Sequence, residues 1–305
     1  MAAANWLTVE LTVPAGAADA VEAALLGLGA LSVSFADPGA EPILEPAPGA
    51  TPLWPQVQVS ALLPAGTAAQ DIRERLQPLL PGPLAIGFST LVERDWVREF
   101  REQLVPQRFG ARLWICPTGA ACPDPAGVAV TLEPGLAFGS GSHPSTALCL
   151  QWLAALPLAG LAVLDYGCGS GVLAIAALAL GARSATALDI DPQALQATRE
   201  NAARNGVVSR LRLALPEQLT CAGDHDVVVA NILAGTLIAL APALHGHCRA
   251  GAHVALSGIL TSQTSQVRTG CRPWLDLRPS GELAGWALLA GTPATGRQPV
   301  DASTG

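Results

Sequence analysis

The sequence contains no lysine, and all 17 of its basic residues are arginine. This absence excludes the chemistries that depend on a lysine side chain: P-loop phosphate binding, a pyridoxal Schiff base and a lysine nucleophile. Charged residues are also scarce, at 13% of 305 residues, whereas hydrophobic residues make up 50%. Such a composition excludes general disorder and supplies a sizeable core.

Cysteine pairs with metal-binding spacing and long apolar runs are lacking as well. The seven cysteines include no C-x-x-C pair, so we expect buried thiols and neither a disulfide framework nor a metal site. The most apolar run, Val227–Leu244, is interrupted by Asn231, Gly235 and Pro242 and predicts a buried strand followed by a helix. Residues 1–13 have no basic stretch ahead of an apolar region, so we predict no secretory signal and a cytoplasmic location.

The net charge of −7 is concentrated at the beginning of the chain. Residues 1–70 hold six acids and no basic side chain, whereas residues 106–305 are balanced. This pattern is the opposite of a phosphate-binding surface, so it favours a basic protein partner and argues against direct nucleic-acid binding; no membrane partner is expected either. The simpler alternative is that a small acidic domain is merely soluble.

The length and a change of pattern near residue 106 predict two domains. Residues 1–92 follow the order strand, helix, strand, strand, helix, strand, which is the ferredoxin-like βαββαβ order. The expected elements are strands 6–13, 31–36, 56–63 and 84–90 and helices 17–27 and 67–80. A proline-rich surface loop is predicted at 37–55 and an amphipathic linker helix at 93–105.

Residues 106–291 alternate strands and helices, which is typical of an α/β doubly wound parallel sheet, and a loose tail follows at 292–305. The expected elements are strands 162–165, 186–189, 210–215, 227–231 and 253–257, helices 172–180, 192–205 and 235–244, and closing strands 274–278 and 286–290. Asp191, Pro192 and Gly206 have the residue types of a helix N-cap, first turn and C-terminal stop.

A glycine-rich turn follows the first strand of this sheet, in the run DYGCGSG at 165–171. Gly167, Gly169 and Gly171 let the backbone approach a ligand at a helix N-terminus. Asp189, at the end of the next strand, is placed to accept hydrogen bonds from a ribose. Because Val172 occupies the third glycine position of a dinucleotide site, the pattern favours S-adenosylmethionine over a nicotinamide cofactor.

Two further segments carry polar groups that suit the rest of such a cofactor. The loop 138–146 runs into a helix opened by Pro144, where the hydroxyls of Ser145 and Thr146 can bind a carboxylate. His143 is expected to cap or pack and is assigned no catalytic role. Asn231 ends a predicted central strand, where its carbonyl can accept from a reacting amine or from the cofactor. The alternative for Asn231 is a helix N-cap.

Together these motifs resemble those of the bacterial ribosomal protein L11 methyltransferases. The matching runs are EPGLAFGSGSHPSTAL at 133–148, DYGCGSG at 165–171, DIDP at 189–192 and NILA at 231–234. The segment 93–100 and the run RFGARLWICP at 108–117 are similar too, so the resemblance spans about residues 93–290. The N-terminal region is similar in its inferred fold and place in the chain.

The resemblance implies a substrate-recognition domain at 1–92, a connecting helix at 93–105 and a class I methyltransferase domain at 106–291. It implies trimethylation of lysine side chains and of the N-terminal amine of protein L11. By position it implies that Thr146, Gly167, Asp189 and Asn231 contact S-adenosylmethionine. We further hypothesise that Asn231 orients the amine or the cofactor; the sequence indicates no general base.

Two other functions remain open at this point. One is an RNA methyltransferase of the same fold, which the acidic N-terminal third disfavours. The other is a non-catalytic S-adenosylmethionine-binding module that associates with the ribosome. It would bind the cofactor without turnover.

Overall fold

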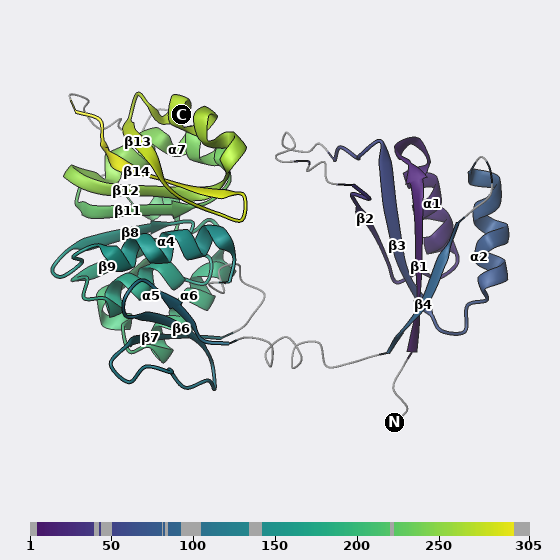
Figure 1. The fold of residues 1–305 in the computed structure, drawn as a ribbon, viewed down its shortest axis with the longest axis horizontal. Coiled ribbons are helices and arrows are strands. Elements are labelled where there is room, and N and C mark those ends of the chain that lie inside the picture. The colour runs from purple at the N-terminus through teal and green to yellow at the C-terminus, as the bar shows by residue number, and fades with distance from the viewer. Residues whose placement is uncertain are drawn as a thin grey trace. The chain divides into compact units, whose positions relative to one another are not determined.

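The computed structural model describes residues 5–39, 43, 51–80, 82, 85–92, 105–133, 142–219 and 223–295. The chain divides into two compact units, Met1–Phe100 and Arg101–Gly305 (Figure 1). The predicted linker helix at 93–105 lies outside the described residues except for Val105, as does most of the predicted proline-rich loop. Among the described residues, no helix is long and apolar enough to cross a membrane.

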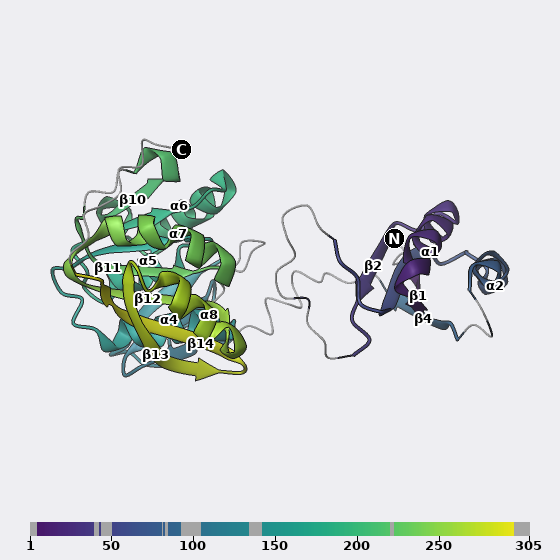
Figure 2. The ribbon, with the colours of Figure 1, turned by 90° about the horizontal axis from the view of Figure 1, so that it is seen from above.

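The first unit is a four-stranded antiparallel sheet with two helices on one face (Figures 1 and 2). Its elements are β1 (Asn5–Pro14), α1 (Ala15–Gly27), β2 (Ser32–Ala36), β3 (Gln56–Pro64), α2 (Ala69–Leu76) and β4 (Gly87–Val92). The strand order β2-β3-β1-β4 is that of a ferredoxin-like fold, as the sequence predicted. Alternate residues of β1 and β3 face the helices and are buried, because successive strand side chains point to opposite faces.

The second predicted helix of this unit is shorter than expected. The sequence predicts a helix at 67–80, whereas α2 ends at Leu76 and a 3₁₀ turn covers Gln77–Leu79. Pro78 lies in that turn, and a proline cannot donate the backbone hydrogen bond that would continue an α-helix.

The second unit is built on a seven-stranded sheet in the order β10-β9-β8-β11-β12-β14-β13. The five strands from β10 to β12 are parallel, and β14 and β13 close the sheet antiparallel. The strands are β8 (Ala162–Tyr166), β9 (Ser184–Leu188), β10 (Leu211–Ala214), β11 (His225–Asn231), β12 (Cys248–Leu260), β13 (Leu275–Leu283) and β14 (Trp286–Pro293). This confirms the predicted doubly wound α/β class.

Helices cover both faces of this sheet. One face packs against α4 (Pro144–Ala155), α5 (Val172–Ala179) and α6 (Pro192–Arg204), the other against α7 (Ala234–His247) and α8 (Thr264–Cys271). The helix α6 begins as predicted, with the Asp191 side chain accepting from the Gln193 amide at 2.8 Å. Gly206 follows its end at a φ of +65°.

Two parts of this unit have no counterpart among the predicted elements. A small sheet is formed by β5 (Gln107–Phe109), β6 (Leu113–Pro117) and β7 (Val128–Leu132), whose strands are too short to give a clear alternation. The helix α8 contains Gly270, which lowers helix propensity. A Cβ at Gly270 would lie 2.7 Å from Cγ2 of Ile238, so the glycine allows α8 to pack closely on α7.

Candidate functional site

The turn between β8 and α5 has a backbone conformation that favours glycine. Gly167, Gly169 and Gly171 all have positive φ angles, between +54° and +80°. A Cβ at Gly167 would lie 2.5 Å from Cγ2 of Ile232, and a Cβ at Gly171 would lie 2.5 Å from Cγ2 of Thr198. The side chains of Ile232 and Thr198 therefore occupy the space that side chains at positions 167 and 171 would need.

Two polar side chains of α6 hold this turn in place by donating hydrogen bonds to its carbonyl groups. The Thr198 hydroxyl donates to the Gly169 carbonyl at 2.9 Å, and the Asn201 amide donates to the Ser170 carbonyl at 3.0 Å. Thr198 and Asn201 are both buried. The sequence did not predict this role, because amphipathic spacing alone does not reveal which polar residues of a helix face inward.

Asp189 lies directly after β9 and beside the glycine turn. Its Oδ2 accepts from the Gly169 amide at 2.9 Å, and its Oδ1 accepts from the Asp191 amide at 3.0 Å. These bonds fix the orientation of a half-buried carboxylate, and each of its oxygens has a second lone pair for another donor. The geometry suits the two hydroxyls of a ribose.

Asp165 connects β8 to the first turn of α5. It is fully buried, and its Oδ2 accepts from the Ala174 amide at 3.0 Å, while its Oδ1 has no hydrogen-bond partner in the described part of the chain. Burial raises the pKa of the Asp165 carboxyl to about 7. Asp165 thus orients the helix that follows the turn.

Asn231 ends β11 with its amide facing the site. Its Nδ2 donates to the Thr146 hydroxyl at 3.1 Å, and its Oδ1 is buried without a partner among the described residues. The N-cap of α7 is Leu233, so the helix-cap alternative for Asn231 is wrong. A buried carbonyl oxygen left without a donor is costly, so Oδ1 of Asn231 is available to accept a hydrogen bond from a ligand.

The described part of the predicted 138–146 loop shows what His143 does. Its Nδ1 accepts from the Ser145 amide at 3.3 Å and lies 2.7 Å from the Ser145 hydroxyl, so His143 is the N-cap of α4. Its ring meets the Trp286 ring edge to face, with centroids 4.5 Å apart. Burial lowers the pKa of His143. The prediction of a capping and packing role is confirmed, whereas residues 138–141 lie outside the described part.

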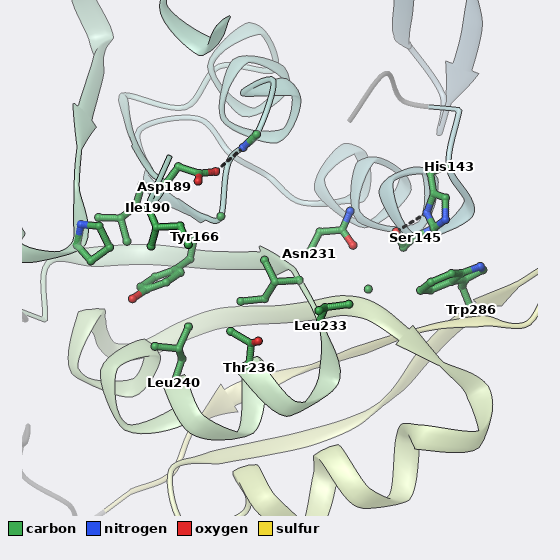
Figure 3. Close-up of a pocket in the computed structure, with 16 residues that line it drawn as sticks. His143, Ser145, Tyr166, Asp189, Ile190, Asn231, Leu233, Thr236, Leu240 and Trp286 are labelled. Atoms are coloured by element: carbon green, nitrogen blue, oxygen red, sulfur yellow. Dashed lines mark hydrogen bonds between the residues drawn. The ribbon is translucent and has the colours of Figure 1, made fainter. Parts of the chain in front are cut away.

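These groups surround one pocket of about 480 Å³ at the carboxyl ends of β8, β9 and β11 (Figure 3). Among its lining residues, Asp189 carries the only carboxylate, and most of the lining is apolar. Of the residues predicted from sequence, Ser145, Gly167, Gly169, Asp189 and Asn231 line it. Thr146 is buried behind Asn231 and reaches the pocket through that amide, and Gly171 packs on α6 instead.

Several lining residues were not predicted. Ile190 is 81% exposed directly after Asp189, Gly258 comes from β12, and Trp286 comes from the start of β14. An apolar residue directly after the acid was a usable signal for Ile190. No local sequence pattern identifies Gly258 or Trp286 as pocket residues, because strand pairing brings them to the pocket.

The pocket fits a nucleoside with a sulfonium-bearing amino acid attached. Its volume is within the range of small-molecule sites, and its apolar walls suit an adenine ring. The carboxylate of Asp189, the backbone of the glycine turn and the unpartnered oxygen of Asn231 offer polar groups at separate points. This turn lacks the third glycine that a pyrophosphate site has at the start of its helix, because Val172 occupies that position as the first residue of α5.

A family model, full-length relatives and one solved structure share the same family name. The family model "Ribosomal protein L11 methyltransferase" matches residues 5–293. The protein of that name from Aeromonas hydrophila is 46% identical over 286 residues, 94% of this chain and 98% of the relative. The one from Pseudomonas fluorescens is 48% identical over 288 residues, with the same coverage. The crystal structure of the ribosomal protein L11 methylase from Lactobacillus delbrueckii subsp. bulgaricus is 31% identical, with a TM-score of 0.55, and covers 62% of this chain and 99% of that one.

Proposed function

Because the chain belongs to the ribosomal protein L11 methyltransferase family, we propose that it transfers methyl groups from S-adenosylmethionine to amines of ribosomal protein L11. The acceptors are lysine side chains and the N-terminal amine, each receiving up to three methyl groups. The reaction takes place in the cytoplasm, where ribosomal proteins are made. The substrate is itself a protein, and its recognition needs no direct contact between this chain and nucleic acid.

The residues around the pocket have distinct roles in holding the cofactor, which supplies an electrophilic methyl group when bound. Asp189 accepts hydrogen bonds from the ribose, and Gly167, Gly169 and Gly171 form the turn that the cofactor approaches. Thr146 acts through its hydrogen bond to Asn231, which fixes the amide orientation.

The unpartnered Oδ1 of Asn231 is the observation that carries this proposal. An amine that attacks a methyl group must be neutral, with a lone pair directed at the methyl carbon, and an unmethylated amine also has N–H groups that this oxygen can accept. Deprotonating a lysine of pKa about 10.4 at pH 7 costs about 4.6 kcal/mol. A neutral amide oxygen orients the amine without the charge of a carboxylate, which would raise the amine pKa further.

The first unit is proposed to recognise the substrate. Glu10 and Asp19 are exposed on it, and residues 1–70 contain no basic side chain. Acids on this unit attract a basic ribosomal protein through complementary charge.

The test is intact-mass analysis of unmethylated L11 after incubation with the protein and S-adenosylmethionine. We expect mass gains in steps of one methyl group. The Asp189→Ala variant should lose both these gains and affinity for S-adenosylhomocysteine, measured by calorimetry. Asp191→Ala is the matched control, because Asp191 caps α6 without lining the pocket.

Asn231 is tested separately from the cofactor site. Asn231→Ala should lose roughly 100-fold in turnover, since misplacing a reacting group costs about that much, and a parallel loss of affinity for S-adenosylhomocysteine would show that the amide also holds the cofactor. Unchanged turnover would contradict its role. Cofactor binding by the wild-type protein without any methyl transfer to L11 would contradict the proposed function, and transfer to a nuclease-sensitive acceptor would favour an RNA substrate.

A further inference from the structure

The two ends of the pocket differ in chemistry. Asp189 lies at one end, Asn231 lies near the middle, and His143 and Trp286 lie at the other end (Figure 3). Among the described lining residues, the end with Trp286 has no carboxylate. A cation there meets an aromatic ring and neutral dipoles.

Trp286 is held firmly at this end. It begins β14 and pairs with Leu260 of β12 and Leu283 of β13. Its ring packs edge to face on His143, at an interplanar angle of 73°. His143 is itself fixed as the N-cap of α4, so its ring holds the indole of Trp286 in a defined position. Burial lowers the pKa of His143, so the imidazole stays neutral and does not repel a nearby cation.

Successive methylation changes what the site must recognise. Each transfer forms an N–C bond as the C–S bond breaks. The first two leave a protonated amine, which must lose its proton to solvent before the next transfer, and the third leaves a quaternary ammonium with no proton. An unmethylated neutral amine has two N–H groups to donate to Oδ1 of Asn231, and a dimethylated one has none. Hydrogen bonding to Asn231 therefore positions the amine for the early transfers and cannot do so for the last.

We propose that Trp286 is the wall that positions the methylated amine, so that it governs the second and third transfers more than the first. The indole face contacts the N-methyl groups of the neutral amine and stabilises the positive charge that develops on its nitrogen as the next methyl group is transferred. This inference rests on the proposed methylation of amines and adds a residue that determines how many methyl groups are transferred.

The experiment follows the mass distribution of L11 over time for three variants. Trp286→Leu should slow the later transfers relative to the first by roughly 3- to 30-fold, the range of a cation–π contact, so that mono- and dimethylated species accumulate. Trp286→Phe keeps an aromatic face and should largely restore complete methylation. Trp274→Leu is the matched control, since Trp274 packs on His245 with centroids 5.8 Å apart and does not line the pocket.

A second readout uses tetramethylammonium chloride as an inhibitor of the first transfer, with sodium chloride at the same concentration as reference. The wild-type and Trp286→Phe proteins should be inhibited more than Trp286→Leu. Equal slowing of all transfers in Trp286→Leu, or the same product distribution as in Trp274→Leu, would overturn the inference. Failure of the wild-type protein to transfer any methyl group would be distinguishable, because it overturns the proposed function itself.

Discussion

At the scale of single residues, Ile232 packs against both the glycine turn and β12 beside the pocket. Its side chain occupies the space above Gly167, and its backbone occupies the space above Gly258 of β12. Its amide donates to the Ser257 carbonyl at 3.2 Å. Because Ile232 follows Asn231 directly, the position of the Asn231 amide depends on how closely β12 approaches.

Gly258→Ala should displace Asn231, because the added Cβ would press on Ile232, which follows Asn231 directly. A Cβ at Gly258 would lie 2.5 Å from the Ile232 carbonyl oxygen, and its φ of +80° adds strain. We expect roughly a 100-fold loss of turnover in the L11 mass assay. Gly251→Ala is the control, because Gly251 has a φ of +78° with nothing within 4 Å of the added Cβ. Equal losses in both variants would show that backbone strain alone is responsible.

Asp165 should make stability depend on pH. Burial raises the pKa of its carboxyl to about 7 in the folded protein, above the value of about 3.9 in an unfolded chain. The folded state therefore holds a proton that the unfolded state has lost, and this contribution to stability falls as the pH rises from about 4 to about 7. Urea unfolding at pH 5 and pH 8 should show Asp165→Asn gaining stability relative to wild type at the higher pH. Parallel changes in both proteins would contradict this.

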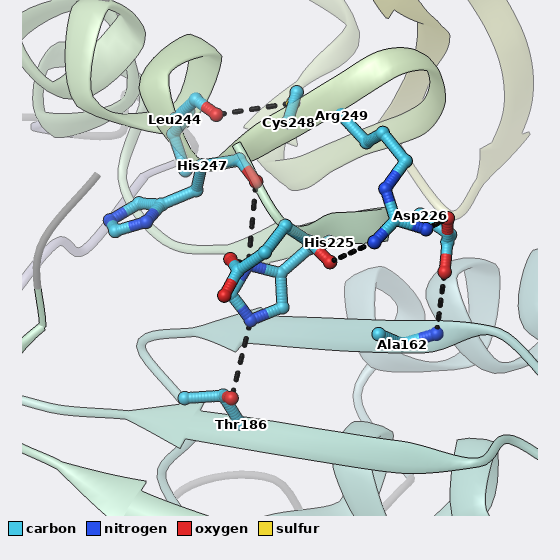
Figure 4. Close-up of polar contacts among 9 residues, drawn as sticks. Ala162, Thr186, His225, Asp226, Leu244, His247, Cys248 and Arg249 are labelled. Carbon is cyan, nitrogen blue, oxygen red and sulfur yellow. Dashed lines mark hydrogen bonds and ion pairs between the residues drawn. The ribbon is translucent and has the colours of Figure 1, made fainter. Parts of the chain in front are cut away.

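At the scale of elements, the amino end of β11 is tied to its neighbours by polar contacts (Figure 4). The His225 Nδ1–H donates to the His247 carbonyl at 3.3 Å, and its Nε2 accepts from the Thr186 hydroxyl at 3.2 Å. Asp226 accepts from the Ala162 amide at 2.9 Å and pairs with Arg249 at 2.6 Å. These contacts join four strands and the end of α7 with His225 in its neutral form.

Acid should weaken this end of the sheet. Burial lowers the pKa of His225 and, helped by the neighbouring His225, lowers that of His247 to about 4. Asp224 and Asp226 oppose the shift at His225, and Arg212 adds to it. Since the unfolded chain takes up these protons near pH 6.5, stability is present above that pH and is lost as the pH falls towards 4.

The measurement is unfolding free energy at pH 7 and pH 5, made in the Asp165→Asn background so that the opposite contribution of Asp165 is removed. His247→Phe should lose less stability between these pH values than its parent. The His247 carbonyl is kept, so its bond to His225 is not the variable. An unchanged pH dependence would contradict the assignment.

Elements with strong local signals could be predicted, and those fixed by long-range packing could not. The glycine turn, Asp189 and the caps of α6 follow from short runs of sequence, and the structure places them within one or two residues of expectation. The three-stranded sheet of β5, β6 and β7 and the helix α8 depend on partners far along the chain. The same holds for Trp286, which β12 and β13 bring to the pocket through strand pairing.

At the scale of the whole molecule, the excess negative charge belongs to the first unit and the pocket belongs to the second. The first 105 residues carry the whole net charge of −7, while the pocket of the second unit has one carboxylate among its described lining residues. If the acids of the first unit attract a basic substrate, they should affect association more than chemistry. Raising the salt concentration from 0.1 M to 1 M shortens the Debye length from about 10 Å to about 3 Å, so KM for L11 should rise several-fold while kcat stays nearly constant.

Charge variants separate this effect from a general response to salt. Glu10→Gln with Asp19→Asn removes two exposed acids from the first unit, and Glu200→Gln with Glu217→Gln removes two from the second. The first pair should raise KM for L11 at low salt and flatten its salt dependence, because the attraction that salt screens has been reduced. The second pair should leave both unchanged. A rise in KM of the same size in both pairs would mean that only total charge matters, and a change confined to kcat would place the acids in the chemical step, where a carboxylate would raise the pKa of the amine and slow the reaction.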